Sequence, residues 1–149
     1  DYYIGKAYQA KNDSAAACEY FEKASTGLDE PSGVLYYNDQ PSDTILYQGL
    51  ANEELGNMAA AKKCYHQLLA FGKKHIFDEV TYDYFAVSLP EIEVFPDNIK
   101  ERNDIYCRYL MALGHIGLGE KDEADALLHE ILRLKADYQG AIRHLPMAE

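Results

Sequence analysis

The side chains with the greatest potential for chemistry are three cysteines and five histidines, and they are scattered along the chain. One short stretch, His75-x-x-Asp78-Glu79, has residue types that bind metal ions. Lys73 and Lys74 stand directly before it, and their positive charges oppose a bound cation. We therefore predict no metal site in this stretch, and we find no other candidate metal site in the sequence.

The cysteines Cys18, Cys64 and Cys107 are odd in number and more than 40 residues apart. This spacing favours neither a disulfide framework nor a paired-cysteine metal site. Cys107 and a distant histidine would make a nucleophile pair, but its place on the inner face of an expected helix favours buried packing. We predict three reduced core cysteines, as is typical of a cytosolic protein.

Sequence motifs for catalysis are also missing. The chain has no Gly-rich phosphate loop, no GxSxG nucleophile elbow and no HExxH zinc helix. We therefore predict that the chain is not an enzyme, with no catalytic residues and no cofactor.

The net charge of the chain disfavours some classes of binding partner. The sequence has 25 acidic and 14 basic residues, which gives a net charge of −11. A negative chain opposes the phosphate attraction that drives nucleic-acid binding, so we expect neither nucleic acid nor an anionic membrane as partner. No apolar run approaches the length of about 18 residues that a membrane-spanning helix needs. We expect a soluble, cytoplasmic chain.

The sequence has no catalytic set, so its function depends on the helices it forms and on the surface they present. Two helix-forming runs between Ile45 and Leu69 meet at Leu55-Gly56-Asn57. Gly56 can adopt the left-handed conformation that ends a helix, and Asn57 can cap the next one. This pattern predicts an αα-hairpin. Small residues are expected where its two helices cross, at Gly49, Ala51, Ala60 and Ala61.

The hairpin pattern recurs along the chain. Its signature is a small residue followed 12 and 16 positions later by an alanine and a large apolar residue. The three copies are Gly5, Ala17 and Phe21; Gly49, Ala61 and Tyr65; and Ala112, Ala124 and Leu128. Self-similarity of this kind indicates a repeat architecture.

These residues resemble the tetratricopeptide repeat, a helix-turn-helix unit of about 34 residues. The chain departs from that pattern at Gln48, Asn52 and His115, where the repeat usually has a leucine or an aromatic residue. A polar group on a packing face must find a partner or water, so the second copy, which contains Gln48 and Asn52, is expected to pack less tightly. The resemblance implies stacked hairpins whose first helices line a concave, partner-binding groove.

The predicted fold is all-α: an αα-hairpin solenoid of about three such repeats with two irregular insertions and a short C-terminal capping helix. We expect one domain over residues 1–149, with units at about 1–27, 43–72 and 98–134, insertions at 28–42 and 76–96, and the cap at 138–145. Asp97 is expected to begin the long helix of the third unit, Leu134 to lie on a buried stripe, and Pro146 to follow the cap. Because the chain opens inside a helix, we also expect a fragment of a longer protein with repeats upstream.

The resemblance places tyrosines on the expected groove, and tyrosine is enriched at protein interfaces. The two-carboxylate clamp of the family needs Lys, Arg and Asn in this groove, where we find only Lys6, so that ligand class is not expected. We predict a non-catalytic scaffold that binds a protein, or another domain of its own full-length chain, through this concave surface. The candidate groove residues are Tyr2, Tyr3, Lys6, Gln9, Asp43, Tyr47, Glu54, Tyr106 and Tyr109.

The two insertions offer an alternative function. They are rich in aromatic residues and resemble the C-terminal repeat region of large bacterial proteins that carry a β-rich, carbohydrate-related domain. This alternative is a carbohydrate-binding accessory module, with tyrosines stacking on sugar rings. Its candidate residues are Tyr36, Tyr37, Asp39, Tyr82 and Tyr84. A homodimer through the first helix is a further candidate, because a missing upstream repeat would leave apolar surface exposed.

Overall fold

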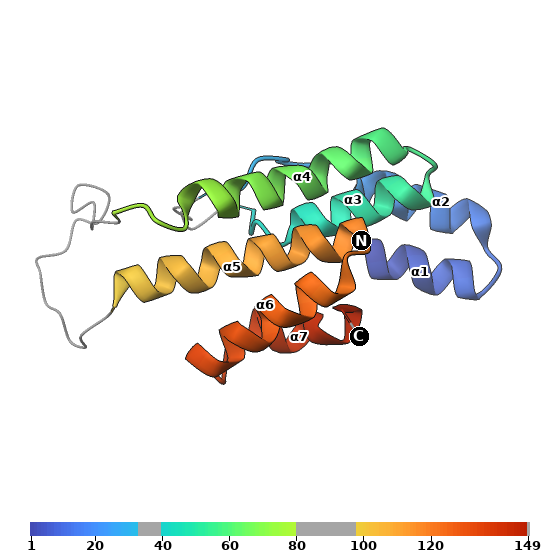
Figure 1. Ribbon diagram of the computed structural model, residues 1–149. Coiled ribbons are helices and arrows are strands. Elements are labelled where there is room, and N and C mark those ends of the chain that lie inside the picture. The colour runs from blue at the N-terminus through green and yellow to red at the C-terminus, as the bar shows by residue number, and fades with distance from the viewer. Residues whose placement is uncertain (33–39, 80–97, 149) are drawn as a thin grey trace, which may run out of the picture.

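The computed structural model describes residues 1–32, 40–79 and 98–148, and all regular structure within them is helical. An all-α repeat fold, as predicted, is therefore confirmed (Figure 1). The helices are α1 (Tyr2–Ala10), α2 (Ser14–Ala24), α3 (Thr44–Glu54), α4 (Met58–His75), α5 (Ile99–Leu118), α6 (Lys121–Leu134) and α7 (Gln139–Ala148). No helix in these ranges combines the length and the apolar composition that crossing a bilayer requires.

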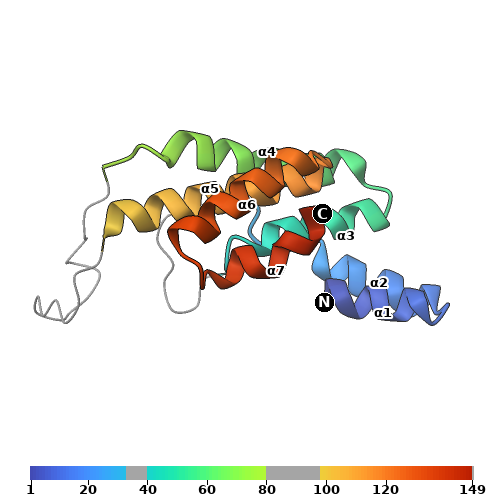
Figure 2. The same ribbon diagram turned by 60° about the horizontal axis from the view of Figure 1, so that its bottom comes forward.

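Six of the helices form the three hairpins α1–α2, α3–α4 and α5–α6. The second helix of each hairpin packs against the first helix of the next element, so α2 contacts α3, α4 contacts α5 and α6 contacts α7. The first helices also contact one another in the order α1, α3, α5 and α7. The result is an inner layer of α1, α3, α5 and α7 and an outer layer of α2, α4 and α6 (Figures 1 and 2).

The turns inside the hairpins follow from local chemistry. Gly56 and Gly119 have φ angles of 78° and 75°, the left-handed conformation that lets a helix end abruptly. In the first hairpin Asn12 takes this role with φ of 60°, and the Asp13 carboxylate accepts a bond from the Ala16 amide at 3.1 Å. Each turn reverses the chain within a few residues, which forces the two helices of a hairpin to lie antiparallel.

Tyr65 is the central side chain of the core. Its ring is fully buried and lies between Gly49 of its own hairpin and Gly117 of the next hairpin. A Cβ atom on Gly49 would lie 2.2 Å from the ring, and one on Gly117 would lie 2.1 Å from it. The predicted crossing of Gly49 and Tyr65 is therefore confirmed, and the same ring also joins the second hairpin to the third.

The buried side chains form one large cluster and one small one. The large cluster is built from α3 to α7, whereas the small cluster consists of Ala17, Phe21 and Ala51 between the first hairpin and α3. The polar residues Gln48 and Asn52 are buried beside it, and both are hydrogen-bonded. Gln48 Nε2 donates to the Leu28 carbonyl and Asn52 Nδ2 to the Gln48 carbonyl, each at 2.9 Å. These bonds allow polar side chains at two positions where the repeat usually has apolar ones.

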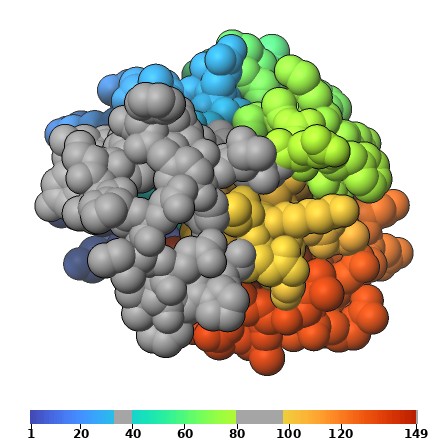
Figure 3. All heavy atoms as spheres, turned by 90° about the vertical axis from the view of Figure 1, so that its left-hand side faces the viewer, coloured from blue at the N-terminus to red at the C-terminus, as the bar shows by residue number. Residues whose placement is uncertain are grey.

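Helices α4 and α5 approach each other closely along their length. A Cβ atom on Gly72 would lie 2.6 Å from the Cys107 carbonyl, and one on Gly114 would lie 2.8 Å from the Tyr65 carbonyl. Glycine at these two positions therefore permits contact between the helix backbones. Figure 3 views the end of this pair, where the last turn of α4 (green) lies beside the first turns of α5 (yellow).

Some local predictions were wrong. Asn98, not Asp97, is the N-cap of α5, and its side chain accepts from the Glu101 amide at 3.2 Å. Ala60 is exposed on α4, and Leu134 is 47% exposed because it lies at the end of α6, beyond the packed stripe.

The predicted capping helix also differs at its end. It continues through Pro146 to Ala148, since a proline in the last turn removes only one of the final hydrogen bonds. The buried residues of α7 are Ala141, His144 and Ala148. Ile142 is 45% exposed. The true face is small and partly polar, so its periodicity is weak in the sequence.

Candidate functional site

The residues with metal-binding chemistry do not converge in the described part of the chain. His75 Nδ1 lies 2.5 Å from Asp78 Oδ2, so these two side chains bind each other at the end of α4. Among residues 1–32, 40–79 and 98–148 there is no group of three histidine, cysteine or acidic side chains placed to hold an ion.

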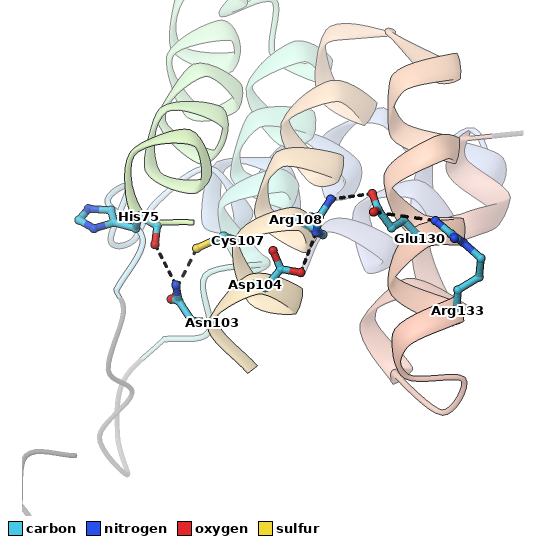
Figure 4. A network of polar contacts seen from close by, with 7 residues as sticks. All are labelled: His75, Asn103, Asp104, Cys107, Arg108, Glu130 and Arg133. Carbon is cyan, nitrogen blue, oxygen red and sulfur yellow. Dashed lines mark hydrogen bonds and ion pairs between the residues drawn. The ribbon is translucent and has the colours of Figure 1, made fainter. Parts of the chain in front are cut away.

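Cys107 is buried, and its thiol takes part in a short chain of hydrogen bonds. The thiol donates to Asn103 Oδ1 at 3.7 Å, and Asn103 Nδ2 donates to the His75 carbonyl oxygen at 2.8 Å (Figure 4). Burial, with smaller contributions from the carboxylates of Asp78 and Asp104, raises the pKa of the thiol to about 11. A thiol that stays protonated is a poor nucleophile. The predicted packing role of Cys107 is confirmed, and the bond from Asn103 to the His75 carbonyl joins α5 to α4.

The other two cysteines differ from each other. Cys64 is buried on α4, as predicted. Cys18 is exposed, so its assignment to the core was wrong. The buried face of α2 is formed by Ala17 and Phe21, and Cys18 lies beside this face, where its thiol is 3.9 Å from Glu22.

A second polar network joins α5 to α6. Arg108 donates from Nε to Asp104 at 2.8 Å and from an Nη atom to Glu130 at 2.6 Å (Figure 4). Arg133 lies 3.8 Å from the same Glu130 carboxylate. The charged groups of this network pair with one another between two adjacent helices, so we assign the network a structural role. The remaining candidate for a functional site is the surface of the inner layer.

Three tyrosines from α1 and α3 cluster on the inner layer. The ring centroids of Tyr2 and Tyr3 are 5.4 Å apart, and the Tyr47 ring lies 5.8 Å from Tyr2 and 5.5 Å from Tyr3. Tyr3 is 61% exposed, whereas Tyr2 and Tyr47 are half-buried. We call Tyr2, Tyr3 and Tyr47 the tyrosine cluster. It brings together three residues that the sequence had placed in two different repeats.

An open pocket of about 310 Å³ adjoins the tyrosine cluster. Besides the three rings it is lined by Asp1, Ile4, Lys23, Ala24, Thr26, Gln40, Thr44 and Gln48. Burial and the nearby Glu54 carboxylate raise the pKa of Tyr2 to about 12, and burial also raises the pKa of Tyr47. The two hydroxyls therefore stay protonated at neutral pH, and the pocket offers a partner aromatic rings and polar groups, with the charged Asp1 and Lys23 also in its lining.

Farther along α1, Lys6 and Gln9 contact Glu54, the last residue of α3. Glu54 accepts from Lys6 Nζ at 2.7 Å and from Gln9 Nε2 at 2.8 Å, and these bonds tie α1 to α3. The pKa of Glu54 is lowered, chiefly by the hydrogen bond from Lys6. Because Lys6 is already paired with a carboxylate, it is poorly placed to receive an acidic peptide.

Two tyrosines of the predicted groove are engaged within the fold. The Tyr106 hydroxyl lies 2.7 Å from both the Ser32 carbonyl oxygen and Ser42 Oγ, so this ring fastens the segment between the first two hairpins. Tyr109 is only 5% exposed, because α7 covers it. The prediction that Tyr109 lines an open surface is therefore wrong.

His144 of α7 is the residue that sequence reasoning missed. It is fully buried, with Nε2 2.8 Å from the Tyr47 hydroxyl and Nδ1 3.1 Å from the Tyr109 hydroxyl. Asp43 lies at the edge of this group, 3.5 Å from the Tyr109 hydroxyl and 3.9 Å from Arg143. The only signal in the sequence was the spacing of Ala141, His144 and Ala148, at i, i+3 and i+7.

The predicted carbohydrate-binding residues Tyr36, Tyr37, Asp39, Tyr82 and Tyr84 lie outside the described residues. The alternative function that rests on them stays a prediction. The part of the predicted groove that is both described and accessible is the surface of α1 and α3.

Comparison with known protein families agrees with this architecture. The family model described as tetratricopeptide repeat matches residues 1–25 and 43–70, which correspond to the first two hairpins. The third hairpin has the same helical arrangement but lies outside the match. No solved structure gives a significant match. Repeats of this kind generally mediate protein–protein interactions and are typically non-catalytic. The first two hairpins of the stack therefore match the tetratricopeptide repeat, which supports assignment of the chain to that repeat family.

Proposed function

We propose that the chain is a non-catalytic scaffold that binds a segment of a partner protein, or of another domain of its own longer chain, on the tyrosine cluster. The observation that carries this proposal is the meeting of three rings from two repeats within 5.8 Å of one another beside an open pocket. Tyrosine gives a large contact area at low ordering cost and a polar tip that can hydrogen-bond to a partner.

The accessible ring of the cluster is the expected anchor. Tyr3 is 61% exposed in the free chain, so a partner that covers it removes more ring surface from water than it would at Tyr2 or Tyr47. Those two rings are half-buried and hold Tyr3 in place from α1 and α3. A preorganised anchor of this kind is typical of interface residues that carry a large share of the binding energy.

A displayed library of random peptides, selected on the chain at neutral pH, tests the proposal and requires no identified partner. Fluorescence anisotropy then measures each selected peptide against Tyr3→Ala and against Tyr20→Ala. Tyr20 is the matched control because it lies on α2 and stacks on Tyr8, away from the tyrosine cluster. We expect Tyr3→Ala to weaken binding by about tenfold or more and Tyr20→Ala to change it by about twofold at most. Equal binding to both variants would place the binding surface elsewhere.

Self-association through α1 is a second candidate, and one observation supports it. Ile4 is 43% exposed directly beside Tyr3, so α1 presents adjacent apolar and aromatic surface. Light scattering over a range of concentrations should then show a dimer that dissociates with Ile4→Asp. A chain that stays monomeric at all concentrations argues against this candidate.

A further inference from the structure

Helix α7 is the last helix of the inner layer and packs against α5 and α6 (Figure 2). Its His144 reaches the hydroxyls of Tyr47 on α3 and Tyr109 on α5, so α7 covers part of the surface that these two helices would otherwise present. Its buried face contains only Ala141, His144 and Ala148. Alanine contributes little apolar area, and Leu145 and Met147 pack against the core but are only partly buried, so His144 is the largest fully buried side chain of α7. The hydrogen bonds of this ring therefore matter more here than they would in a large apolar interface.

The partners of His144 fix its protonation state. Nδ1 lies 2.8 Å from the Gly140 carbonyl oxygen, which can only accept, so Nδ1 carries the ring hydrogen. Nε2 is then the acceptor, and the Tyr47 hydroxyl donates to it. This arrangement is complete for a neutral imidazole. A second proton on Nε2 would reverse this bond, so that Nε2 donates to the Tyr47 oxygen and the hydroxyl hydrogen needs another acceptor. It would also place a positive charge on a fully buried ring, which is unfavourable.

The charged and titratable groups around the ring do not offset the cost of adding this second proton. From α3 and its N-cap the ring faces Tyr47 and Asp43, from α5 Tyr109, and from its own helix Arg143. The Asp43 carboxylate favours the charged imidazole, but the Arg143 guanidinium opposes it and lies 3.9 Å from the same carboxylate. Tyr138, which packs on Tyr109, is neutral because burial raises its pKa to about 12. Burial of the ring is the largest influence and lowers the pKa of His144 below its ordinary 6.5.

We propose that α7 is a proton-sensitive cover of the concave face: protonation of His144 releases α7 and exposes the hydroxyls of Tyr47 and Tyr109. The proposal rests on the proposed function in one respect, because Tyr47 belongs to the tyrosine cluster and Tyr109 would extend that cluster onto α5. Acidification then enlarges the binding surface, and neutral pH keeps it limited to the part formed by α1 and α3.

The direction of the effect follows from linkage. The released state binds its proton at the ordinary pKa of 6.5, whereas the covered state binds it only at lower pH. Between these two values the released state holds one proton more. Its population relative to the covered state therefore rises by up to about tenfold for each unit by which the pH falls.

Hydrogen exchange measured by mass spectrometry tests the proposal on the chain alone. Exchange of α7 and of α6, as an internal reference, is recorded at about pH 7.5 and about pH 5.5, and each rate is normalised to that of the unfolded peptide at the same pH. We expect the protection of α7 to fall in the acid sample by up to about tenfold, while that of α6 falls less. In His144→Gln, which has no titrating group at this position, the loss of protection should disappear.

Three results would each overturn the proposal. They are protection of α7 that does not depend on pH, a pH dependence that persists in His144→Gln, and a His144 imidazole that titrates at or above 6.5 in the NMR spectrum of the unaltered chain. The NMR titration needs no variant, so it decides the matter even where His144→Gln fails to fold. None of these measurements involves a partner, so their outcome is independent of the peptide experiment at neutral pH.

Discussion

The packing of Tyr65 allows a quantitative prediction for Gly49→Ala. A glycine-to-alanine change inside a helix ordinarily stabilises by about 1 kcal/mol, because alanine loses less backbone entropy on folding. Here the new methyl group would lie 2.2 Å from the ring of Tyr65, well inside the ordinary contact distance of 3.4 Å. The ring must therefore shift, because distortion of bond angles alone cannot relieve an overlap of this size.

The surroundings of the ring decide how large the strain is. Tyr65 has little room to swing away from Gly49, because the ring is fully buried and the same Cδ1–Cε1 edge also lies against Gly117, where a Cβ atom would lie 2.1 Å away. Overpacking of this kind typically costs about 1–3 kcal/mol, and a ring enclosed on both sides belongs at the upper end. Subtracting the helix gain of about 1 kcal/mol leaves a net loss of about 2 kcal/mol in the free energy of unfolding.

Urea melts followed by far-ultraviolet circular dichroism measure this loss. Ala60→Gly, on the exposed side of α4, calibrates the helix term in the same protein and should cost about 1 kcal/mol. Tyr65→Leu should make Gly49→Ala less harmful, so the double variant should lose less than the sum of the two single ones. If Gly49→Ala instead stabilises the chain by the amount that Ala60→Gly destabilises it, the ring does not lie against Gly49 and the hairpin register is wrong.

Three further predictions concern other parts of the fold. Ala61→Leu, and the same change at the equivalent alanines of the other two hairpins, should lower the free energy of unfolding by about 1–3 kcal/mol in urea melts, because each alanine is buried at a helix crossing. Tyr106→Phe should lower it by about 1 kcal/mol and speed hydrogen exchange around Ser32, whose carbonyl loses its bond; unchanged exchange there would contradict the contact. Glu54→Gln should weaken the pairing with Lys6 by less than about 1 kcal/mol, and added salt should remove the difference. Because Lys6 holds the folded-state pKa of Glu54 below its ordinary 4.5, this contribution is present above pH 4.5 and is lost as the pH falls below it, so the variant should lack that part of the acid sensitivity.

The sequence by itself determined the hairpins. The glycine at position 56 and the Asn12-Asp13 pair are local signals, because a left-handed residue or a helix cap acts on its immediate neighbours only. The small residue, alanine and large residue at fixed spacing identify the repeat in the same way, since Gly49 and Tyr65 belong to one hairpin. These signals predicted the helices to within a few residues.

Tertiary structure decided which tyrosine side chains are accessible to a partner. Tyr3, Tyr106 and Tyr109 look alike in the sequence, but one is exposed, one is bonded to a connecting segment and one is covered by α7. The difference depends on what packs against each ring from tens of residues away, and periodicity carries no information about that.

The role of His144 depended on tertiary structure for the same reason. On an isolated helix, alanine and histidine at i and i+3 define no clear apolar face, and the larger Ile142 and Leu145 suggest a different one. Only the placement of α7 against Tyr47 and Tyr109 removes the imidazole from water and satisfies both ring nitrogens. The sequence determined that a helix forms there, and the packing of three distant segments determined that its histidine is buried and neutral, because desolvation depends on every neighbour that excludes water.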